Sequence, residues 1–275
     1  MKVTFIGHVS KDVNVVDGKE EIVAGGGVFY GGIAVSCLEE EAEVYTKCAK
    51  RDVEIFSEMW DKNVDVHFLK SATTTSIRNV YFGGDSDKRK SEVISLAAPF
   101  NEKDLSNLNE EFLHVNPLWF GEFPDDLVPF IRKKTKFLAG DAQGFLRNVE
   151  NGKMVYKDWE NKEIYLQHFD LFKVDSTESK ILTGEKELKR AIEKIHEMGV
   201  SLVLATYQDG VYVYDGKKFY HADFGKWKLE GRTGRGDTCT AAFITAMNKM
   251  NLSSATEFAA NITTRKMQYS GPLRC

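Results

Sequence analysis

The sequence predicts an α/β fold: a doubly wound, mainly parallel sheet flanked by helices, with a small antiparallel β lid. Two observations lead to this fold class. Short apolar runs alternate with helical patterns along most of the 275 residues, as in βαβ units. Two other stretches alternate apolar and polar residues around glycine turns with no helix between them, as in β-hairpins. We expect one domain over residues 1–275.

The elements of the parallel sheet follow in order along the chain. Helical patterns occupy residues 28–38 and 51–63, and a third helix ends at Gly199, which suits a C-terminal cap. The expected strands are residues 3–7, 42–48, 65–69, 112–116, 137–141, 171–174 and 201–206. Helices between them supply the crossover connections that parallel strands require.

Three hairpins break this alternation. Residues 13–24 turn at Asp17-Gly18, and residues 74–95 turn at Gly83-Gly84-Asp85. Because neither has a crossover helix, neither fits the parallel sheet, and we expect the two to form the lid. The alternative is that they are surface hairpins only. The third hairpin, residues 211–221, is expected to extend the sheet edge.

Composition argues against several classes of protein. The net charge of −4 gives no basic field of the kind that nucleic-acid binders use. No apolar segment has the length of a membrane span, and the N-terminus lacks a secretory signal. The cysteines form no C-x-x-C pair, which disfavours zinc and thioredoxin-like sites. Cys37 and Cys239 lie in apolar helical patterns and are expected to be buried thiols, which favours a cytoplasmic location.

The most informative stretch is Gly231-Arg-Thr-Gly-Arg-Gly-Asp237. Residues 230–250 read as a loop followed by a helix with one apolar face. Gly234 and Gly236 let the backbone turn amide hydrogens toward one point, and the helix N-terminus adds free amides and partial positive charge. We therefore expect an anion site suited to a phosphoryl group in transfer.

Asp237 falls in the first turn of that helix and is the expected general base. The alternative is a carboxylate that only complements the helix dipole. Arg235 is expected to contact phosphates, with an exposed loop arginine as the alternative. Arg-Gly-Asp at 235–237 also matches a cell-adhesion tripeptide, which suits an intracellular-looking chain poorly. Neither the P-loop pattern nor the dinucleotide pattern occurs.

At these residues the chain resembles the ribokinase-like (PfkB-type) carbohydrate kinases over nearly its whole length. Thr233-Gly-Arg-Gly-Asp-Thr238 is similar to the T-G-A-G-D motif of that family. Gly25-Gly-Gly27 matches the family's other glycine motif, which lines the acceptor pocket. Asp12 matches the early Asp that holds substrate hydroxyls, and its alternative is a strand-end turn residue. The resemblance implies ATP as donor, with Thr233, Gly234 and Gly236 on its phosphates.

Two further motifs imply a nucleotide and Mg²⁺. Asp175-Ser-Thr-Glu178 occupies the place of the family's N-x-x-E motif, which organises Mg²⁺; the alternative is a helix capping box. Thr206-Tyr-Gln-Asp-Gly210 is similar to the family's nucleotide-binding turn, although it is one residue shorter and lacks the first glycine. Gly231 stands where many relatives have an Asp that helps bind an activating monovalent cation, so the resemblance carries over no potassium requirement.

Within the family the chain is most similar to myo-inositol kinases of archaea and thermophiles. The likeness rests on Gly25-Gly-Gly-Val-Phe-Tyr30, Asn116-Pro117 and Asp141-Ala-Gln-Gly-Phe-Leu-Arg147. A polyol needs partners that can accept and donate hydrogen bonds. The expected acceptor-binding residues are Asp12, Gly26, Gly27, Tyr30, Asn116, Gln143 and Arg147.

The expected reaction moves the γ-phosphoryl group of ATP to a hydroxyl of myo-inositol or a related polyol or sugar. The amides of Gly234, Arg235 and Gly236 would stabilise the phosphoryl charge, and the lid would exclude water. One alternative is a related kinase acting on a nucleoside or a keto-deoxy sugar acid. Another is a catalytically weak polyol-binding protein of the same fold. Exposed lid edges would also permit a homodimer.

Overall fold

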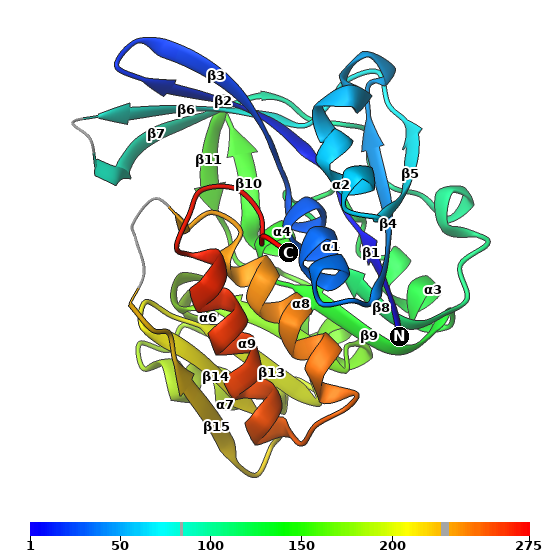
Figure 1. Ribbon diagram of the computed structural model, residues 1–275. Helices are drawn as coiled ribbons and strands as arrows, with labels where there is room; N and C mark the ends of the chain where they lie inside the picture. The colour runs from blue at the N-terminus through cyan, green and yellow to red at the C-terminus, as the bar shows by residue number, and fades with distance from the viewer. Residues whose placement is uncertain (83–84, 227–230) are drawn as a thin grey trace.

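The computed structural model describes residues 1–82, 85–226 and 231–275. Within these ranges it holds two sheets: a large one with helices on both faces, and a smaller one that projects from one edge (Figure 1). The predicted fold class is confirmed. The turn at Gly83-Gly84 and the start of the 230–250 segment at Glu230 lie outside the described residues.

All seven strands predicted for the parallel sheet are present. The nine strands of the large sheet are β1 (Lys2–Ile6), β4 (Glu41–Cys48), β5 (Asp65–Lys70), β8 (Glu110–Val115), β9 (Thr135–Asp141), β12 (Leu171–Asp175), β13 (Leu202–Thr206), β14 (Gly210–Tyr214) and β15 (Phe219–Asp223). Their order is β15-β14-β13-β12-β9-β8-β1-β4-β5. The seven strands from β13 to β5 in this order are mutually parallel. The predicted hairpin β14–β15 extends the β13 edge with antiparallel pairing.

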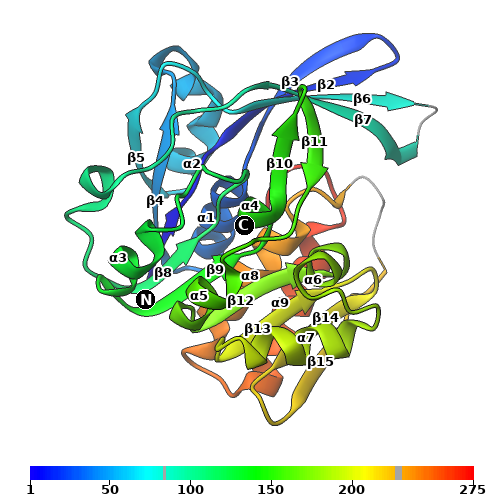
Figure 2. The same ribbon diagram turned by 180° about the vertical axis from the view of Figure 1, so that it is seen from behind.

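Helices cover the two faces of this sheet. One face carries α1 (Gly27–Cys37), α8 (Arg235–Met247) and α9 (Leu252–Lys266), which pack together over an apolar cluster (Figure 1). The opposite face carries α3 (Leu127–Arg132), α5 (Lys162–Tyr165), α6 (Ser176–Thr183) and α7 (Leu188–Glu197) over a second cluster (Figure 2). The short helix α4 (Gln143–Leu146) follows β9.

The helix expected at residues 51–63 differs from the prediction. It is a 3₁₀ segment, η1 (Lys50–Phe56), that continues into the short helix α2 (Ser57–Asp61). Asp52 within it is buried and accepts hydrogen bonds from Lys11 at 3.0 Å and Thr74 at 2.7 Å. These tertiary contacts tie the segment to the second sheet, and sequence periodicity does not report them. Two further 3₁₀ segments are η2 (Glu102–Leu105) and η3 (Leu166–His168).

The second sheet contains both hairpins that were expected to form the lid, and a third. Its strands are β2 (Ser10–Val16), β3 (Lys19–Gly25), β6 (Ser76–Phe82), β7 (Asp85–Ser95), β10 (Arg147–Glu150) and β11 (Lys153–Tyr156), in the order β10-β11-β7-β6-β2-β3. Most pairs are antiparallel, but β2 and β6 run parallel. The β2–β3 turn has positive φ at Asp17 and Gly18, as a tight two-residue hairpin turn requires.

The prediction of a buried thiol at Cys37 is wrong. Cys37, at the end of α1, forms a disulfide with Cys275, with 4.7 Å between the Cα atoms. The C-terminal segment folds back onto α1, and this return is invisible in the sequence because 238 positions separate the cysteines. Cys239 is a buried free thiol, as expected. Among the described residues, no helix is long and apolar enough to cross a membrane.

Candidate active site

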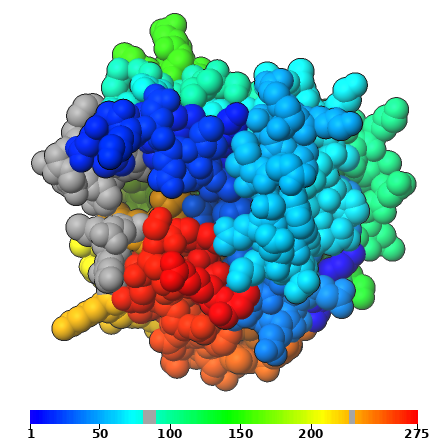
Figure 3. Space-filling model, turned by 45° about the horizontal axis from the view of Figure 1, so that its top comes forward, coloured from blue at the N-terminus to red at the C-terminus, as the bar shows by residue number. Residues whose placement is uncertain are grey.

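The predicted site residues gather at the edge where the parallel strands end. Asn116 follows β8, Asp141 ends β9 and Asp175 ends β12. Thr206 ends β13 and is the register partner of Asp175. Carboxyl ends of parallel strands are the usual place for a ligand in an open α/β sheet. Viewed from this edge, the surface is hollowed between the N-terminal strands and the C-terminal segment (Figure 3).

The loop and helix predicted as an anion site are present. Helix α8 begins at Arg235, and Gly234 precedes it with φ of 77°. A Cβ at Gly234 would lie 2.2 Å from the Tyr30 ring, so both conformation and space require glycine here. The Arg235 amide donates to the carbonyl of Arg232 at 3.1 Å and is therefore engaged within the loop.

Asp237 is held by a side chain from a distant strand. Asn116 Nδ2 donates to Asp237 Oδ1 at 3.0 Å. Asn116 is fully buried, and Gly27 leaves it room, because a Cβ at position 27 would lie 2.3 Å from its Oδ1 atom. The two glycine motifs thus meet at one carboxylate. Asn116, which was expected to bind the acceptor, contacts Asp237 in this structure.

Lys173 is a site residue that sequence reasoning missed. It lies on β12, buried, with Nζ 3.2 Å from Asp141 Oδ2 and 3.5 Å from Glu178 Oε2. Burial disfavours its charge, but Asp141 and Glu178 outweigh burial and raise the pKa of Lys173. A Cβ at Gly236 would lie 3.0 Å from its Nζ atom, so the ammonium borders the anion loop (residues 231–237). The sequence does contain a signal for this residue, since Lys173 interrupts the apolar strand β12.

The Asp175–Glu178 motif forms the capping box that was weighed as its alternative reading. Asp175 Oδ1 accepts the amides of Thr177 at 2.7 Å and Glu178 at 2.8 Å, and Glu178 Oε2 accepts the Asp175 amide at 2.7 Å. Burial raises the pKa of Glu178 to about 8, against the effect of Lys173. Capping uses Oδ1 of Asp175 only, so these residues also fit a divalent cation held through water.

Arg235 is not the exposed loop arginine of the alternative reading. Its guanidinium lies 5.8 Å from the Phe224 ring, and burial lowers its pKa. Its Nη1 atom is buried and has no hydrogen-bond partner in the part of the chain that the structure describes. A buried donor without a partner is costly, which suits a site that receives an anionic ligand.

The remaining predicted residues lie around this centre. Gly26 caps α1 with φ of 104°. Asp12 lies beside Gly25, because a Cβ at position 25 would lie 3.2 Å from Asp12 Oδ2. Arg147 Nη2 donates to Gln143 Oε1 at 2.9 Å, and its guanidinium lies 5.4 Å from the Trp119 ring. The structure thus pairs Gln143 with Arg147.

Thr206 and Gly210, also expected at the nucleotide, lie at the two ends of the β13–β14 connection. Thr206 is buried at the end of β13, next to Asp175 in the register of the sheet. The carbonyl of Gly210 accepts the amide of Tyr207 at 3.0 Å, which closes the turn. The turn therefore borders the Asp175 side of the site.

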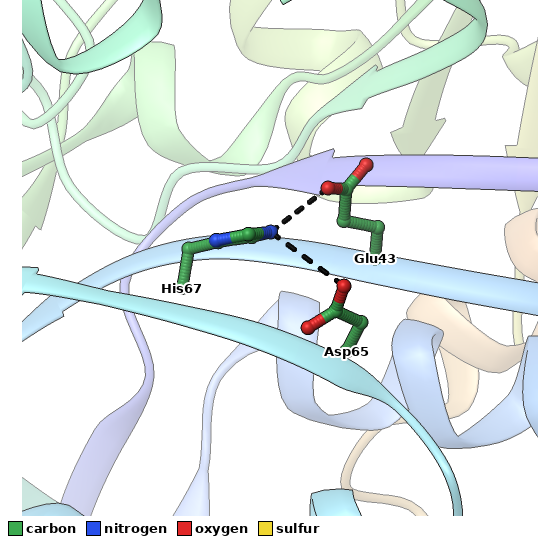
Figure 4. Close-up of side chains that lie close together, drawn as sticks. All are labelled: Glu43, Asp65 and His67. Atoms are coloured by element: carbon green, nitrogen blue, oxygen red, sulfur yellow. Dashed lines mark hydrogen bonds and ion pairs between the residues drawn. The ribbon is translucent and has the colours of Figure 1, made fainter.

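A cluster of metal-capable groups lies elsewhere, on β4 and β5. Glu43, Asp65 and His67 point toward one another (Figure 4), with His67 Nε2 2.8 Å from Glu43 Oε1 and 3.8 Å from Asp65 Oδ2. Glu43 Oε2 already accepts from Lys2 at 2.9 Å and Thr4 at 3.0 Å. The cluster is thus accounted for as an ion-pair network on the sheet.

Comparison with solved structures gives close matches. A sulfate complex of a pyrophosphate-dependent kinase in the ribokinase family is 55% identical, with a TM-score of 0.94, over 99% of this chain and 97% of that one. A second structure, of a pyrophosphate-dependent kinase complexed with a pyrophosphate analog and myo-inositol, is 54% identical, with a TM-score of 0.93 and the same coverage. Neither a family model nor a curated protein matches the chain.

A third solved structure concerns the conversion of a pyrophosphate-dependent myo-inositol-1 kinase into a myo-inositol-3 kinase; it is 52% identical, with a TM-score of 0.92, over 99% and 95% of the two chains. Fold and site therefore define a phosphotransferase with an alcohol group as acceptor. The chain belongs to the ribokinase family. It is a carbohydrate or polyol kinase, and the resemblance to myo-inositol kinases is confirmed.

Proposed function

We propose that this chain transfers a phosphoryl group from pyrophosphate to myo-inositol, with Asp237 as general base. The observation that carries the chemistry is the hydrogen bond from Asn116 to Asp237 at the start of α8. It fixes a carboxylate beside the loop expected to hold the phosphoryl group. The 54% identical kinase whose structure contains myo-inositol supports the choice of acceptor.

Pyrophosphate as donor is supported by the cations near the anion loop. Lys173 borders Gly236. The pKa of Arg235 is lowered mainly by burial and next by the charge of Arg232, so the two guanidinium groups lie close together. The buried Nη1 of Arg235 has no partner among the described residues. A compact, highly charged donor would satisfy such a cluster through charge-assisted hydrogen bonds. The 52–55% identical kinases use pyrophosphate.

ATP, the donor expected from the sequence, is the second candidate. The observation that favours it is the position of Thr206, which is register partner to Asp175 and places the β13–β14 turn at the same edge. Against it stands the shortened turn without the first glycine. The two donors share the chemistry at the acceptor, so the choice between them leaves the role of Asp237 unchanged.

In the proposed reaction Asp237 accepts the proton of the acceptor hydroxyl on Oδ2, the oxygen that Asn116 does not hold. The hydroxyl oxygen forms a bond to phosphorus while the bridging P–O bond of pyrophosphate breaks, and inorganic phosphate leaves. Lys173 and Arg235 stabilise the charge on the leaving group. Mg²⁺, held through water at Asp175, would neutralise donor oxygens.

We assign the choice of hydroxyl to two residues of the second sheet. Ser91 Oγ donates to Asn79 Oδ1 at 2.7 Å, and Asn79 Nδ2 donates to Asn14 Oδ1 at 3.1 Å. In the 52% identical kinase, replacing one Asn and one Ser by Leu moves phosphorylation from position 1 to position 3 of myo-inositol. We propose that Asn79 and Ser91 orient the acceptor in the same way, with the second sheet as the closing lid.

A homodimer through the lid is part of the proposal. Ile22 on β3 and Ile94 on β7 are 56% and 55% exposed, and both line one hollow with Val13 of β2. Apolar side chains gathered on a sheet with a free edge suit a second copy of the same sheet. Light scattering on the purified chain tests this, and a monomer at micromolar concentration contradicts it.

We propose the cytoplasm as the location. The buried free thiols of Cys48 and Cys239 support it, whereas the Cys37–Cys275 disulfide argues against a reducing compartment, and cell fractionation tests it.

The test of the function is a panel of donors and acceptors with Mg²⁺, read by phosphorus NMR. Pyrophosphate and ATP are each combined with myo-inositol, ribose, fructose, adenosine and 2-keto-3-deoxygluconate. We expect inositol monophosphate from pyrophosphate. Transfer from ATP alone selects the second donor, and transfer only to a nucleoside or sugar acid overturns the acceptor. Binding of myo-inositol without any turnover would favour a catalytically weak binding protein.

A further inference from the structure

Lys266 is a buried cation that the mechanism above does not use. It is the last residue of α9 and has no exposed surface. Its ammonium group donates to the carbonyl oxygen of Gly231 at 2.6 Å and to that of Thr233. The Tyr30 ring lies 5.5 Å away. The ligands of this ammonium are therefore two backbone carbonyls of the anion loop and the aromatic face of Tyr30 on α1.

Among the described residues Lys266 forms no ion pair, although Asp237 lies near enough to raise its pKa. A buried charge without an ion-pair partner is expensive, and lysine is rarely fully buried. Convergent backbone carbonyls are the ligands with which proteins replace the hydration shell of a monovalent metal ion. The loop therefore offers two carbonyl ligands of the kind that a monovalent metal ion uses, and the chain's own ammonium group binds both.

The same loop has no room for a carboxylate that would bind a free ion. A Cβ at Gly231 would lie 2.1 Å from the carbonyl oxygen of Met267, the residue after Lys266. Any side chain at position 231 would collide with the end of α9. Glycine at 231 and lysine at 266 are therefore parts of one arrangement, in which α9 closes against the loop and supplies the charge.

The contact to Thr233 reaches the predicted anion-binding amides through peptide geometry. The carbonyl of Thr233 and the N–H of Gly234 belong to one planar trans peptide and point in opposite directions. When Lys266 holds the carbonyl, it also fixes the direction of the Gly234 amide. Lys266 touches no substrate in this scheme and is a positioning residue.

We propose that the Lys266 ammonium is a built-in monovalent cation for the anion loop, so that phosphoryl transfer by this chain requires no K⁺ or Na⁺. This proposal rests on the proposed kinase function. Burial lowers the pKa of Lys266 to about 8, while Asp237 acts to raise it. The side chain therefore carries its charge at neutral pH, as the proposal needs.

The first test uses the wild-type chain. Initial rates of phosphoryl transfer are measured at pH 7 and constant ionic strength in potassium, sodium and tetramethylammonium chloride, with every stock solution free of other alkali ions. We expect rates equal to within about twofold. A rate in potassium more than about tenfold above the rate in tetramethylammonium overturns the proposal.

The second test removes the ammonium group in two ways. Lys266→Met keeps the length of the side chain without its charge, and Lys266→Ala opens a space next to the carbonyls. We expect kcat to fall about 10²-fold in both, because the Gly234 amide loses its fixed direction. Ammonium or K⁺ restores Lys266→Ala to within about tenfold of the wild type and has no effect on Lys266→Met.

Arg265→Ala is the matched control, because it removes a charge from the neighbouring, exposed position of α9 and should retain full activity. A purely structural Lys266 would give no ion-specific rescue. Full activity in both Lys266 variants, or a Lys266→Ala variant indifferent to monovalent cations, overturns the proposal. If the variants fail to fold by circular dichroism, the wild-type salt comparison decides the question.

A separate readout distinguishes failure of this inference from failure of the proposed function. The thermal midpoint of Lys266→Ala is measured in potassium and in tetramethylammonium chloride, with the wild type beside it. We expect K⁺ to raise the midpoint of the variant only. If the wild type transfers no phosphoryl group in any salt, the proposed function fails, and the cation site is still judged by this shift.

Discussion

At the scale of single residues, the contact between Asn116 and Asp237 has a defined polarity. The amide nitrogen of Asn116 donates and Oδ1 of Asp237 accepts, so the contact fixes the direction of the carboxylate. The amide is fully buried between Gly27 and α8, which leaves it little freedom to turn. A carboxylate with a fixed direction is what a general base requires before the acceptor arrives.

This polarity predicts the effect of Asn116→Asp. A second carboxylate at hydrogen-bond distance disfavours ionisation, so the apparent pKa of the pair rises. The base then stays protonated to higher pH, so the acidic limb of the kcat–pH profile shifts to higher pH by at least about one pH unit. Asn116→Ala is the control: it should lower kcat without that displacement. Identical limbs in all three proteins would contradict the role of Asn116.

Residues also show the limit of sequence reasoning at the site. Asp237, Gly234 and Gly236 were recognised because they are neighbours in a short motif. Lys173 was visible as a lysine in an apolar strand, but its partners Asp141 and Glu178 come from other elements. Such a residue gains its meaning only when the strand order is known.

At the scale of elements, the start of α6 combines capping with the proposed cation site. Asp175→Ser should keep the cap and lose the carboxylate, whereas Asp175→Ala loses both. In urea titrations we expect the free energy of unfolding of the serine variant to lie within about 0.5 kcal/mol of the wild-type value. That of the alanine variant should be lower by about 1 kcal/mol. Both should need more Mg²⁺ for half-maximal rate. A serine variant with the wild-type Mg²⁺ response would leave only the capping role.

The hairpins show which local signals sequence reasoning used and which it missed. The turn at Asp17-Gly18 led to β2 and β3 because apolar and polar residues alternate around it. Asn151-Gly152 carries the same turn signal, with φ of 51° and 73°, yet β10–β11 was not predicted. Its strands have four residues each, too few for alternation to stand out.

At the scale of the whole molecule, the Cys37–Cys275 bond closes almost the entire chain into one loop. Such a loop restricts the unfolded chain strongly, so Cys275→Ser or reduction should lower the free energy of unfolding by about 2–4 kcal/mol. For a chain of this size that is several degrees in the thermal midpoint, measured by calorimetry with and without reductant. Reductant should not shift Cys275→Ser further. An unchanged midpoint in both cases would contradict a stabilising bond.

The long-range order of the molecule explains what the sequence could and could not predict. The seven parallel strands followed from apolar runs and connecting helices. The strand order, the return of the tail to α1 and the approach of α9 to the anion loop depend on contacts between distant segments, such as Lys266 with Gly231. Local periodicity carries no record of such contacts.

The role of Asp237 is the central claim, and Asp237→Asn tests it most directly. The substitution keeps the size of the side chain and removes its ability to accept a proton. Phosphoryl transfer to myo-inositol is measured for both proteins at saturating donor, with circular dichroism and the thermal midpoint as controls for folding. The proposed mechanism predicts an intact fold and a kcat lowered by about 10²–10⁴-fold. A kcat near that of the wild type would contradict it.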